Sequence, residues 1–218
     1  MTIRHHPDTA TLMSFAAGSL GEALSAVVAA HIDMCPRCAT EARRLERIGA
    51  AMFEALTPAS MTASAPSHAT IAALTVESPS RARDTDDDGE LDVPRPLRRL
   101  VGGELDRVAW RRIGIGVWHY PLPLSADAKG DLRLLKVAAG QAMPEHGHGG
   151  AELTLMLRGS YRDEVGTFRK GDLADLDDDI EHRPVADLDE GCICLIASEE
   201  KAKFRGLLAR LFQPLTGF

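Results

Sequence analysis

The sequence lacks the features that mark several common classes of protein. Among its 218 residues no run of lysine and arginine exceeds two, and the net charge is −7. Binding to nucleic acid requires a basic face, so we expect no nucleic-acid partner and disfavour a DNA-binding regulator. The longest apolar stretch, Leu24 to Ala30, is far shorter than the roughly 18 residues of a membrane-spanning helix. The first residues, MTIRHHPD, carry no apolar segment typical of a signal peptide, so we expect a cytoplasmic protein with no membrane partner.

Cysteine is also scarce, with four residues in the whole chain. In the reducing cytoplasm, closely spaced cysteines are metal ligands or redox groups more often than structural disulfides. Two of the four lie in the stretch HIDMCPRC, residues 31–38, where a histidine is followed by Cys35 and Cys38. This spacing indicates a candidate metal site.

Composition divides the chain into three regions. Residues 1–56 are rich in Ala, Leu, Glu and Arg with helical periodicity, whereas residues 57–95 are rich in Ser, Thr, Pro and Ala before the acidic stretch DTDDDGELD. The middle region cannot bury enough apolar surface to order itself, so we predict a flexible linker. Residues 107–213 alternate short β-like runs with glycine and aspartate turns and end in a predicted amphipathic helix over Phe204 to Phe212. A short predicted helix near residues 96–106 either completes the helical region or begins the β region.

Apolar spacing predicts three helices in the first region. Pro7 and Asp8 suit the first turn of the first helix. The second helix carries His31 in its last turn, and the third begins with Cys35 as its N-cap and Pro36 as its first residue. One face of the third helix is apolar and consists of Leu45, Ile48, Met52 and Leu56.

Two cysteines in a CxxC that opens a helix can direct both sulfurs toward one point, as the ligands of a metal do. The positive end of a helix favours the thiolates of Cys35 and Cys38, but with His31 they leave a tetrahedral zinc one ligand short. The nearest further candidates are His5 and His6, ahead of the first helix. A three-helix unit of about 55 residues has a marginal core, which a structural zinc would stabilise. Alternatively, the histidine caps its helix and the two cysteines are small buried groups.

The pattern resembles the zinc-binding anti-sigma domain, in which a histidine near the N-terminus precedes H-x3-C-x2-C on short helices. His6, His31, Cys35 and Cys38 match it, with His5 as the one ambiguity. The resemblance implies a domain that holds an extracytoplasmic-function sigma factor away from RNA polymerase.

A second group of candidate ligands lies in the β region, starting in GQAMPEHGHGGAELTLMLRG. Its members are His146, His148, Glu152 and His182. Residues two apart in a strand face the same side, so His146 and His148 can both point into one cavity. From Glu152 onward the sequence alternates, with Leu153, Leu155 and Leu157 on the opposite face. Three imidazoles and one carboxylate suit zinc, iron, manganese or nickel; the alternative is four solvated side chains around a glycine-rich loop.

The same stretch resembles the two sequence motifs of the cupin family. Residues 140–159 match the first motif at each anchor position, and in the second motif His182 stands eleven residues after Gly171. Three positions depart from the second motif: Asp177, Asp179 and Ala186 replace its proline, glycine and asparagine. The resemblance implies a cupin barrel that binds a metal.

An anti-sigma domain joined to a cupin resembles the ChrR-like family of anti-sigma factors. It implies two domains, an all-α zinc-binding bundle over residues 1–56 and an all-β cupin barrel, or jelly roll, over residues 107–213. The implied function is not enzymatic: the protein sequesters an extracytoplasmic-function sigma factor and releases it when the cupin senses oxidative stress, such as singlet oxygen. We expect the sigma interface to include Leu12, Phe15, Leu45 and Met52.

Two alternatives stay open at this point. A cupin metal can activate dioxygen, which would make the chain a dioxygenase-like enzyme with an accessory helical domain, although the sequence indicates no substrate. Cys192 and Cys194 lie in the apolar run CICLIA, about 6.7 Å apart by the rise of a strand. That spacing is at the edge of disulfide reach, so we expect two buried small side chains, with a redox role as the alternative.

Overall fold

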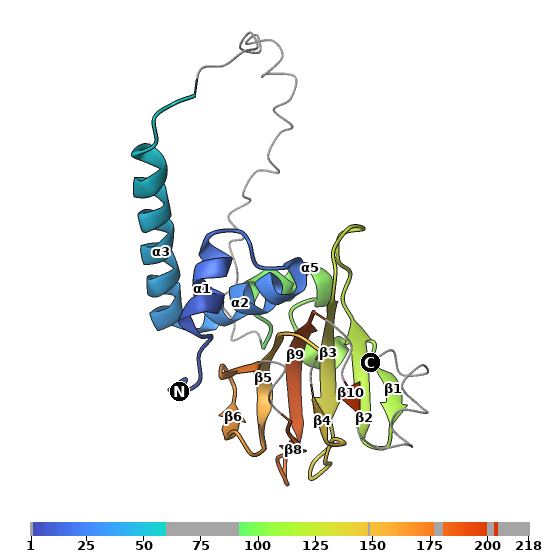
Figure 1. Ribbon diagram of the computed structural model, residues 1–218. Helices are drawn as coiled ribbons and strands as arrows, with labels where there is room; N and C mark the ends of the chain where they lie inside the picture. Colours follow the sequence, from blue (N-terminus) through green and yellow to red (C-terminus); the bar gives the residue numbers. More distant parts are fainter. Residues whose placement is uncertain (1, 60–91, 148, 177–180, 200–202, 205–218) are drawn as a thin grey trace.

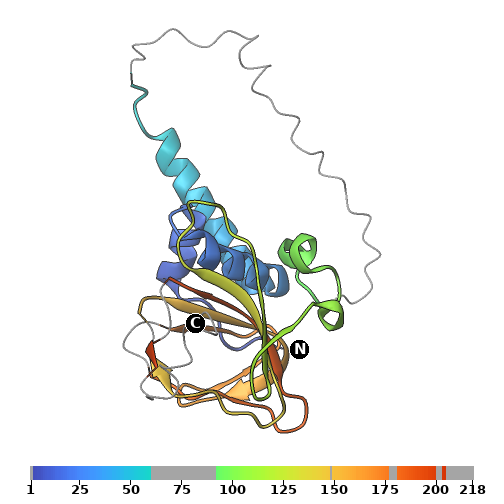
Figure 2. The same ribbon diagram turned by 90° about the vertical axis from the view of Figure 1, so that its right-hand side faces the viewer.

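A layer of helices covers one face of a β-barrel (Figures 1 and 2). The structure, a computed structural model, describes residues 2–59, 92–147, 149–176, 181–199 and 203–204. The helices are α1 (Thr9–Ala16), α2 (Glu22–Met34), α3 (Pro36–Glu54) and α5 (Arg95–Val101), followed by a 3-10 helix at Leu105–Arg107. In the described part of the chain no helix is long and apolar enough to cross a membrane.

Local residue chemistry sets the ends of the helices. Asp8 is the N-cap of α1, because its carboxylate accepts a hydrogen bond from the N–H of Thr11 at 2.6 Å. Asp8 therefore precedes the helix, and its predicted place in the first turn was wrong. Cys35 ends α2 and caps α3, and Pro36 is the first residue of α3, which confirms both predictions.

The barrel is built from antiparallel strands. Their bounds are β1 (Arg111–Gly114), β2 (Val117–Pro121), β3 (Asp131–Val137), β4 (His146–Gly147), β5 (Glu152–Arg162), β6 (Thr167–Arg169), β7 (Leu173–Leu176), β8 (Val185–Ala186), β9 (Cys192–Ser198) and β10 (Lys203–Phe204). One sheet runs in the order β1-β2-β3-β9-β5-β6, with β7 and β8 also paired to β5, and a second sheet pairs β10 with β4. The predicted fold class, a helical N-terminal region and an all-β cupin barrel, is confirmed.

Two hydrophobic cores lie on opposite faces of the main sheet. Cys192 and Cys194 of β9 belong to the inner core within the barrel, whereas Ile193 and Leu195 belong to the outer core beneath the helices. Because both faces of β9 are covered, its sequence is a continuous apolar run rather than an alternating one. The prediction of a buried strand at this place is confirmed.

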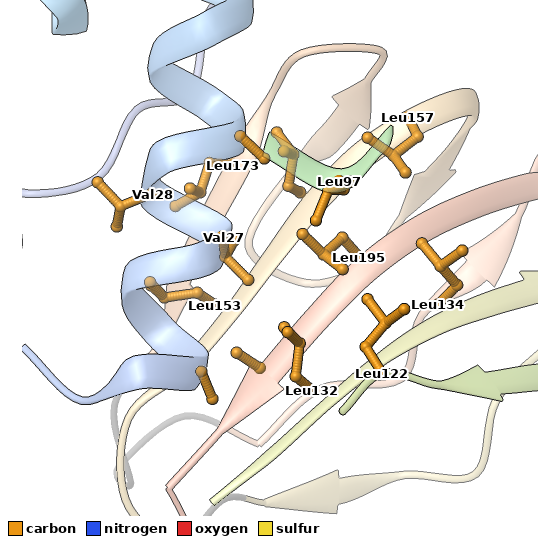
Figure 3. Close-up of a cluster of buried hydrophobic side chains, with 14 of the residues drawn as sticks. Val27, Val28, Leu97, Leu122, Leu132, Leu134, Leu153, Leu157, Leu173 and Leu195 are labelled. Carbon is orange, nitrogen blue, oxygen red and sulfur yellow. The ribbon is translucent and has the colours of Figure 1, made fainter. Parts of the chain in front are cut away.

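Helix α2 supplies the helical side of the outer core. It packs against β5 and β9, and Figure 3 shows Val27 over the sheet beside Leu153 and Leu195. All three side chains are at most 1% exposed. The helical region is therefore stabilised by burial against the barrel, and not only by contacts among its own helices.

Helix α5 and the residues that flank it contact both halves of the molecule. It packs against α2, and the Arg95 guanidinium pairs with Asp33 of α2 at 2.6 Å. On the barrel side, Arg158 of β5 forms ion pairs with Asp92 and Asp106, which flank the helix. Gly102, with a φ of +79°, ends α5 before the predicted residue 106.

The residues expected at a sigma interface divide into two groups. Leu12 is buried in the outer core, and Phe15 and Leu45 are half-buried against it, so their apolar side chains are already engaged within the protein. The inclusion of Leu12 was wrong. Met52 is 67% exposed and remains accessible to a partner.

Parts of two predicted segments lie outside the described residues. These are residues 60–91 of the predicted linker and residues 205–218, which contain most of the predicted terminal helix. Phe204, the expected first residue of that helix, is instead in strand β10, paired with His146 of β4.

The shared outer core predicts that helices and barrel unfold together. Replacing Leu195 by alanine removes a side chain that is 0% exposed, which we expect to lower the free energy of unfolding by about 2–5 kcal/mol. The denaturation midpoint followed by helical circular dichroism and the midpoint followed by the tryptophan fluorescence of the barrel should both fall by the same amount. Leu188→Ala is the matched control, because Leu188 is 74% exposed and its loss should change stability by at most about 0.5 kcal/mol. Separate helical and barrel transitions in the parent protein would contradict the shared core.

Candidate metal sites

The structure brings together His6, His31, Cys35 and Cys38, here called the tetrad. One ligand atom from each lies within 4.8 Å of all the others. The Nδ1 of His6 is 3.5 Å from the Sγ of Cys35 and 3.3 Å from the Sγ of Cys38. The helical elements explain the convergence, since the two cysteines flank the start of α3, His31 lies in the last turn of α2, and His6 precedes α1.

Hydrogen bonding fixes the tautomer of His31 in a form that can bind a metal. Its Nδ1 lies 3.0 Å from the carbonyl oxygen of Gly171, and a carbonyl only accepts, so Nδ1 carries the proton. The other ring nitrogen, Nε2, is buried and has no hydrogen-bond partner among the described residues. A buried lone pair that faces two thiols and a second imidazole is the arrangement a tetrahedral metal requires, so these residues fit zinc.

Burial disfavours the charged forms of two members of the tetrad, His31 and Cys38. It lowers the pKa of His31 to about 4, and together with the neighbouring Cys35 it raises the pKa of the Cys38 thiol to about 12. A bound dication reverses this balance because it stabilises the thiolates directly. A bound cation would therefore offset the cost of ionising the Cys38 thiol at this buried position.

The sequence left open whether His5 or His6 joins the cysteines, and the structure places His6 beside them. His6 faces the cysteines, whereas the ring of His5 packs on Phe168 of the barrel with centroids 4.4 Å apart. The Nδ1 of His5 lies 3.4 Å from the Asp172 carboxylate. His5 thus contacts the cupin and is not part of the tetrad.

A second group, here called the cupin triad, lies inside the barrel. Ligand atoms of His146, Glu152 and His182 lie within 4.8 Å of one another, and the Nε2 atoms of the two histidines are 3.3 Å apart. His146 is in β4, Glu152 begins β5, and His182 forms an isolated bridge with His146. The fourth predicted ligand, His148, lies outside the described residues.

Each imidazole of the cupin triad is oriented through its Nδ1. The Nδ1 of His182 is 2.7 Å from an oxygen of Asp163, and the Nδ1 of His146 is 2.9 Å from the carbonyl oxygen of Pro144. Both Nε2 atoms are therefore directed toward the shared point, as in metal sites where a second group sets the tautomer. The arrangement suits a first-row metal held by imidazole and carboxylate.

The cupin triad opens into a barrel cavity of about 80 Å³. Other side chains in its wall are Arg133, Tyr161, Cys192, Cys194 and Met143. The hydroxyl of Tyr161 is buried without a hydrogen-bond partner among the described residues, and both cysteines are free thiols. A metal here would sit in a partly apolar cavity.

Comparison with known proteins places this architecture in a family. The family of ChrR cupin-like domains matches residues 99–202. The anti-sigma-E factor ChrR of Cereibacter sphaeroides is 41% identical over 217 residues, which cover 98% of each chain. The chain belongs to the ChrR family of anti-sigma factors.

A solved structure supports the same relationship in three dimensions. The anti-sigma factor ChrR of Rhodobacter sphaeroides, crystallised in complex with SigE, is 40% identical and has a TM-score of 0.73; the match covers 90% of this chain and all of that one. The recognition of a ChrR-like protein from the sequence is confirmed. The relative is a regulator rather than an enzyme, so the expectation of a non-enzymatic ChrR protein is supported over the dioxygenase alternative.

Some residues that shape the sites of this ChrR-family chain were not found in the sequence. Asp163 orients His182 from nineteen residues away, and Gly171 orients His31 through a backbone carbonyl, for which no side-chain signal exists. Arg133 was detectable, because it shares the alternating inward face of β3 with Leu135 and Val137. A buried arginine in such a pattern indicates a polar cavity.

Proposed function

We propose that this chain is a cytoplasmic anti-sigma factor that sequesters an extracytoplasmic-function sigma factor through its helical region. Oxidative stress, such as singlet oxygen, acts on the cupin domain and causes release. The observation that carries the proposal is the similarity over 98% of the chain to an anti-sigma factor, together with a related structure solved in complex with SigE.

The second half of α3 is the surface we assign to the sigma factor. Four large apolar residues are exposed there or just beyond its end: Ile48, Met52, Phe53 and Leu56, with exposed fractions of 48, 67, 76 and 66%. In Figure 1 this part of α3 extends away from both the other helices and the barrel. An amphipathic helix with an uncovered apolar face is a common way to bind a partner in a groove.

We assign zinc to the tetrad, because two thiolates and two imidazoles form a closed structural zinc set. The cupin triad, with His148 as its proposed third imidazole, would bind zinc, iron, manganese or nickel. Zinc at the tetrad would hold His6, the end of α2 and the start of α3 in one geometry. That geometry sets the direction in which the exposed half of α3 projects.

Co-expression tests the proposal directly. We expect the full chain and an extracytoplasmic-function sigma factor from the same organism to co-purify as a one-to-one complex that fails to support transcription with RNA polymerase. Exposure to singlet oxygen should then dissociate the complex. Free sigma factor and full transcription in the presence of the unstressed chain would refute sequestration.

The cupin triad should be required for the response but not for sequestration. We expect Glu152→Gln, which removes the triad's anionic ligand, to lower the metal content from two ions per chain to one while the sigma complex still forms. Dissociation under singlet oxygen should be lost or strongly slowed. Glu145→Gln is the matched control, because Glu145 is exposed and close in sequence; it should behave as the parent protein. Normal release by Glu152→Gln would exclude the triad as the sensor.

A further inference from the structure

One segment of the barrel contacts both candidate metal sites. It runs from Asp163 to Asp172, contains β6, and is here called the coupling hairpin. At its start the Asp163 carboxylate is 2.7 Å from the Nδ1 of His182 in the cupin triad. At its end the Gly171 carbonyl is 3.0 Å from the Nδ1 of His31 in the tetrad. The groups that orient one histidine of each site thus belong to the same short stretch of backbone.

The coupling hairpin also holds the chain that leads into His6. Asp172 is 3% exposed, and its Oδ1 accepts hydrogen bonds from the N–H groups of Arg4 and His5 at 2.7 and 3.1 Å. Its Oδ2 accepts from the N–H of Arg169 at 2.9 Å. The backbone adds a further link, since the N–H of Leu173 donates to the carbonyl of His5 at 3.2 Å. The position of His6 is therefore set by the cupin.

Packing inside the coupling hairpin is continuous from the barrel cavity to His5. Tyr161, which lines the cavity, stacks on Phe168 with centroids 4.9 Å apart, and Phe168 contacts the ring of His5. The turn at Gly171 is closely packed against the N-terminal segment. Gly171 has a φ of +88°, and a Cβ at this position would lie 2.7 Å from the side chain of Ile3. Closely packed groups of this kind shift together rather than independently.

We propose that the coupling hairpin transmits the state of the cupin triad to the tetrad, with Gly171 and Asp172 as positioning residues for its two histidines. The cysteines are held by the α2–α3 junction, whereas His31 and His6 depend on the barrel. A displacement at His182 thereby loosens half of the tetrad's ligands. The link to sigma release rests on the proposed function, but the coupling between the two sites does not.

Cobalt(II) binding to the metal-free full chain tests the positioning role. Cobalt–thiolate charge-transfer absorption reports thiolate ligands, and the part of it that the C35S/C38S variant lacks is assigned to the tetrad, because Cys192 and Cys194 also line the barrel cavity. We expect Asp172→Asn to weaken cobalt binding at the tetrad by about 10–100-fold, the usual effect of removing a group that orients a ligand. Asp187→Asn is the matched control: its carboxylate likewise accepts backbone N–H groups, from Asp189 and Glu190 in the β8–β9 turn, and its loss should leave the affinity unchanged. An unchanged affinity in Asp172→Asn would overturn the positioning role.

A double-mutant cycle tests transmission. Glu152→Gln, which empties the cupin triad, should weaken cobalt binding at the tetrad by at least about 5-fold, and it should have no further effect once Asp172→Asn is present. Independent, additive effects would overturn the coupling. If Asp172→Asn fails to fold, His5→Ala replaces it in the cycle, because it removes the contact with Phe168 without opening the barrel core. No sigma factor is present in these measurements, so a failure of coupling is distinguishable from a failure of sequestration.

Discussion

We expect the C35S/C38S double variant to lose the metal of the tetrad and to bind the sigma factor at least about 100-fold more weakly. The reason lies in how α3 is held. Of its nineteen residues only Cys38 and Ala42 are buried, and both lie in the first half. Without the metal, α3 keeps its packing on α1 and α2 but loses the link between its first turn, His6 and the end of α2, so we expect the proposed sigma surface on its second half to be presented less precisely.

The loss should be local, and this separates the role of the metal from general unfolding. Helix α2 is held by the outer core, where Val27 and Val28 are 0% exposed. We therefore expect the double variant to keep the tryptophan fluorescence of the barrel and most of its helical circular dichroism. Binding of the sigma factor can be measured by titration calorimetry, and the metal by elemental analysis.

The chain provides a matched control in its other cysteine pair. C192S/C194S makes the same two substitutions at positions that are also buried, but these lie in the barrel cavity. We expect that variant to keep one metal at the tetrad and the full affinity for the sigma factor. Equal losses in both double variants would show that the effect comes from destabilisation and not from the tetrad.

The sequence predicted best those features that depend on short spacings. Three members of the tetrad lie within residues 31–38, and the junction of two helices brings their backbones together, although the ring of His31 is oriented by the Gly171 carbonyl of the barrel. The alternation after Glu152 likewise predicted which residues face the cavity and which face outward, because the period of a strand is fixed by its geometry. In the structure Thr154 lines the cavity and Leu155 is in the outer core.

The docking of the helices on the barrel was not predicted, for a physical reason. An apolar stripe on a helix has the same pattern whether another helix or a sheet covers it. A signal was nevertheless present in α2, whose buried residues are Ala23, Leu24, Val27, Val28, Ala30 and His31. Successive apolar positions of this kind occupy more than one face of a helix, which indicates a helix covered on more than one side.

The groups that orient the metal ligands could not be predicted from the sequence, for a different reason. Gly171 acts through its carbonyl on a histidine 140 residues away, and every residue carries a carbonyl. Asp172 accepts hydrogen bonds from the backbone N–H groups of Arg4 and His5. Almost every residue carries such an N–H group, so the sequence does not indicate which ones are used. Long-range contacts between backbone and side chain appear only once the fold is known.

Changing Met52 and Phe53 to aspartate should abolish tight sigma binding while leaving both metals in place. These residues are 67 and 76% exposed, so no buried contact within the chain is lost, and stability should change by no more than about 0.5 kcal/mol per substitution. If their side chains fill apolar pockets on the partner, each change costs about 2 kcal/mol or more in binding. The double variant should then bind at least about 100-fold more weakly by calorimetry.

The matched control for M52D/F53D is Ile115→Asp, since Ile115 is 82% exposed but lies in the β1–β2 turn of the barrel. We expect it to bind the sigma factor as the parent chain does, although it introduces the same charge in place of an exposed apolar side chain. Comparing M52D/F53D with C35S/C38S then separates two roles in one helix: the first half of α3 orients it through the tetrad, and the second half makes the contact. Full sigma affinity in M52D/F53D with an intact tetrad would place the contact elsewhere on the helical region.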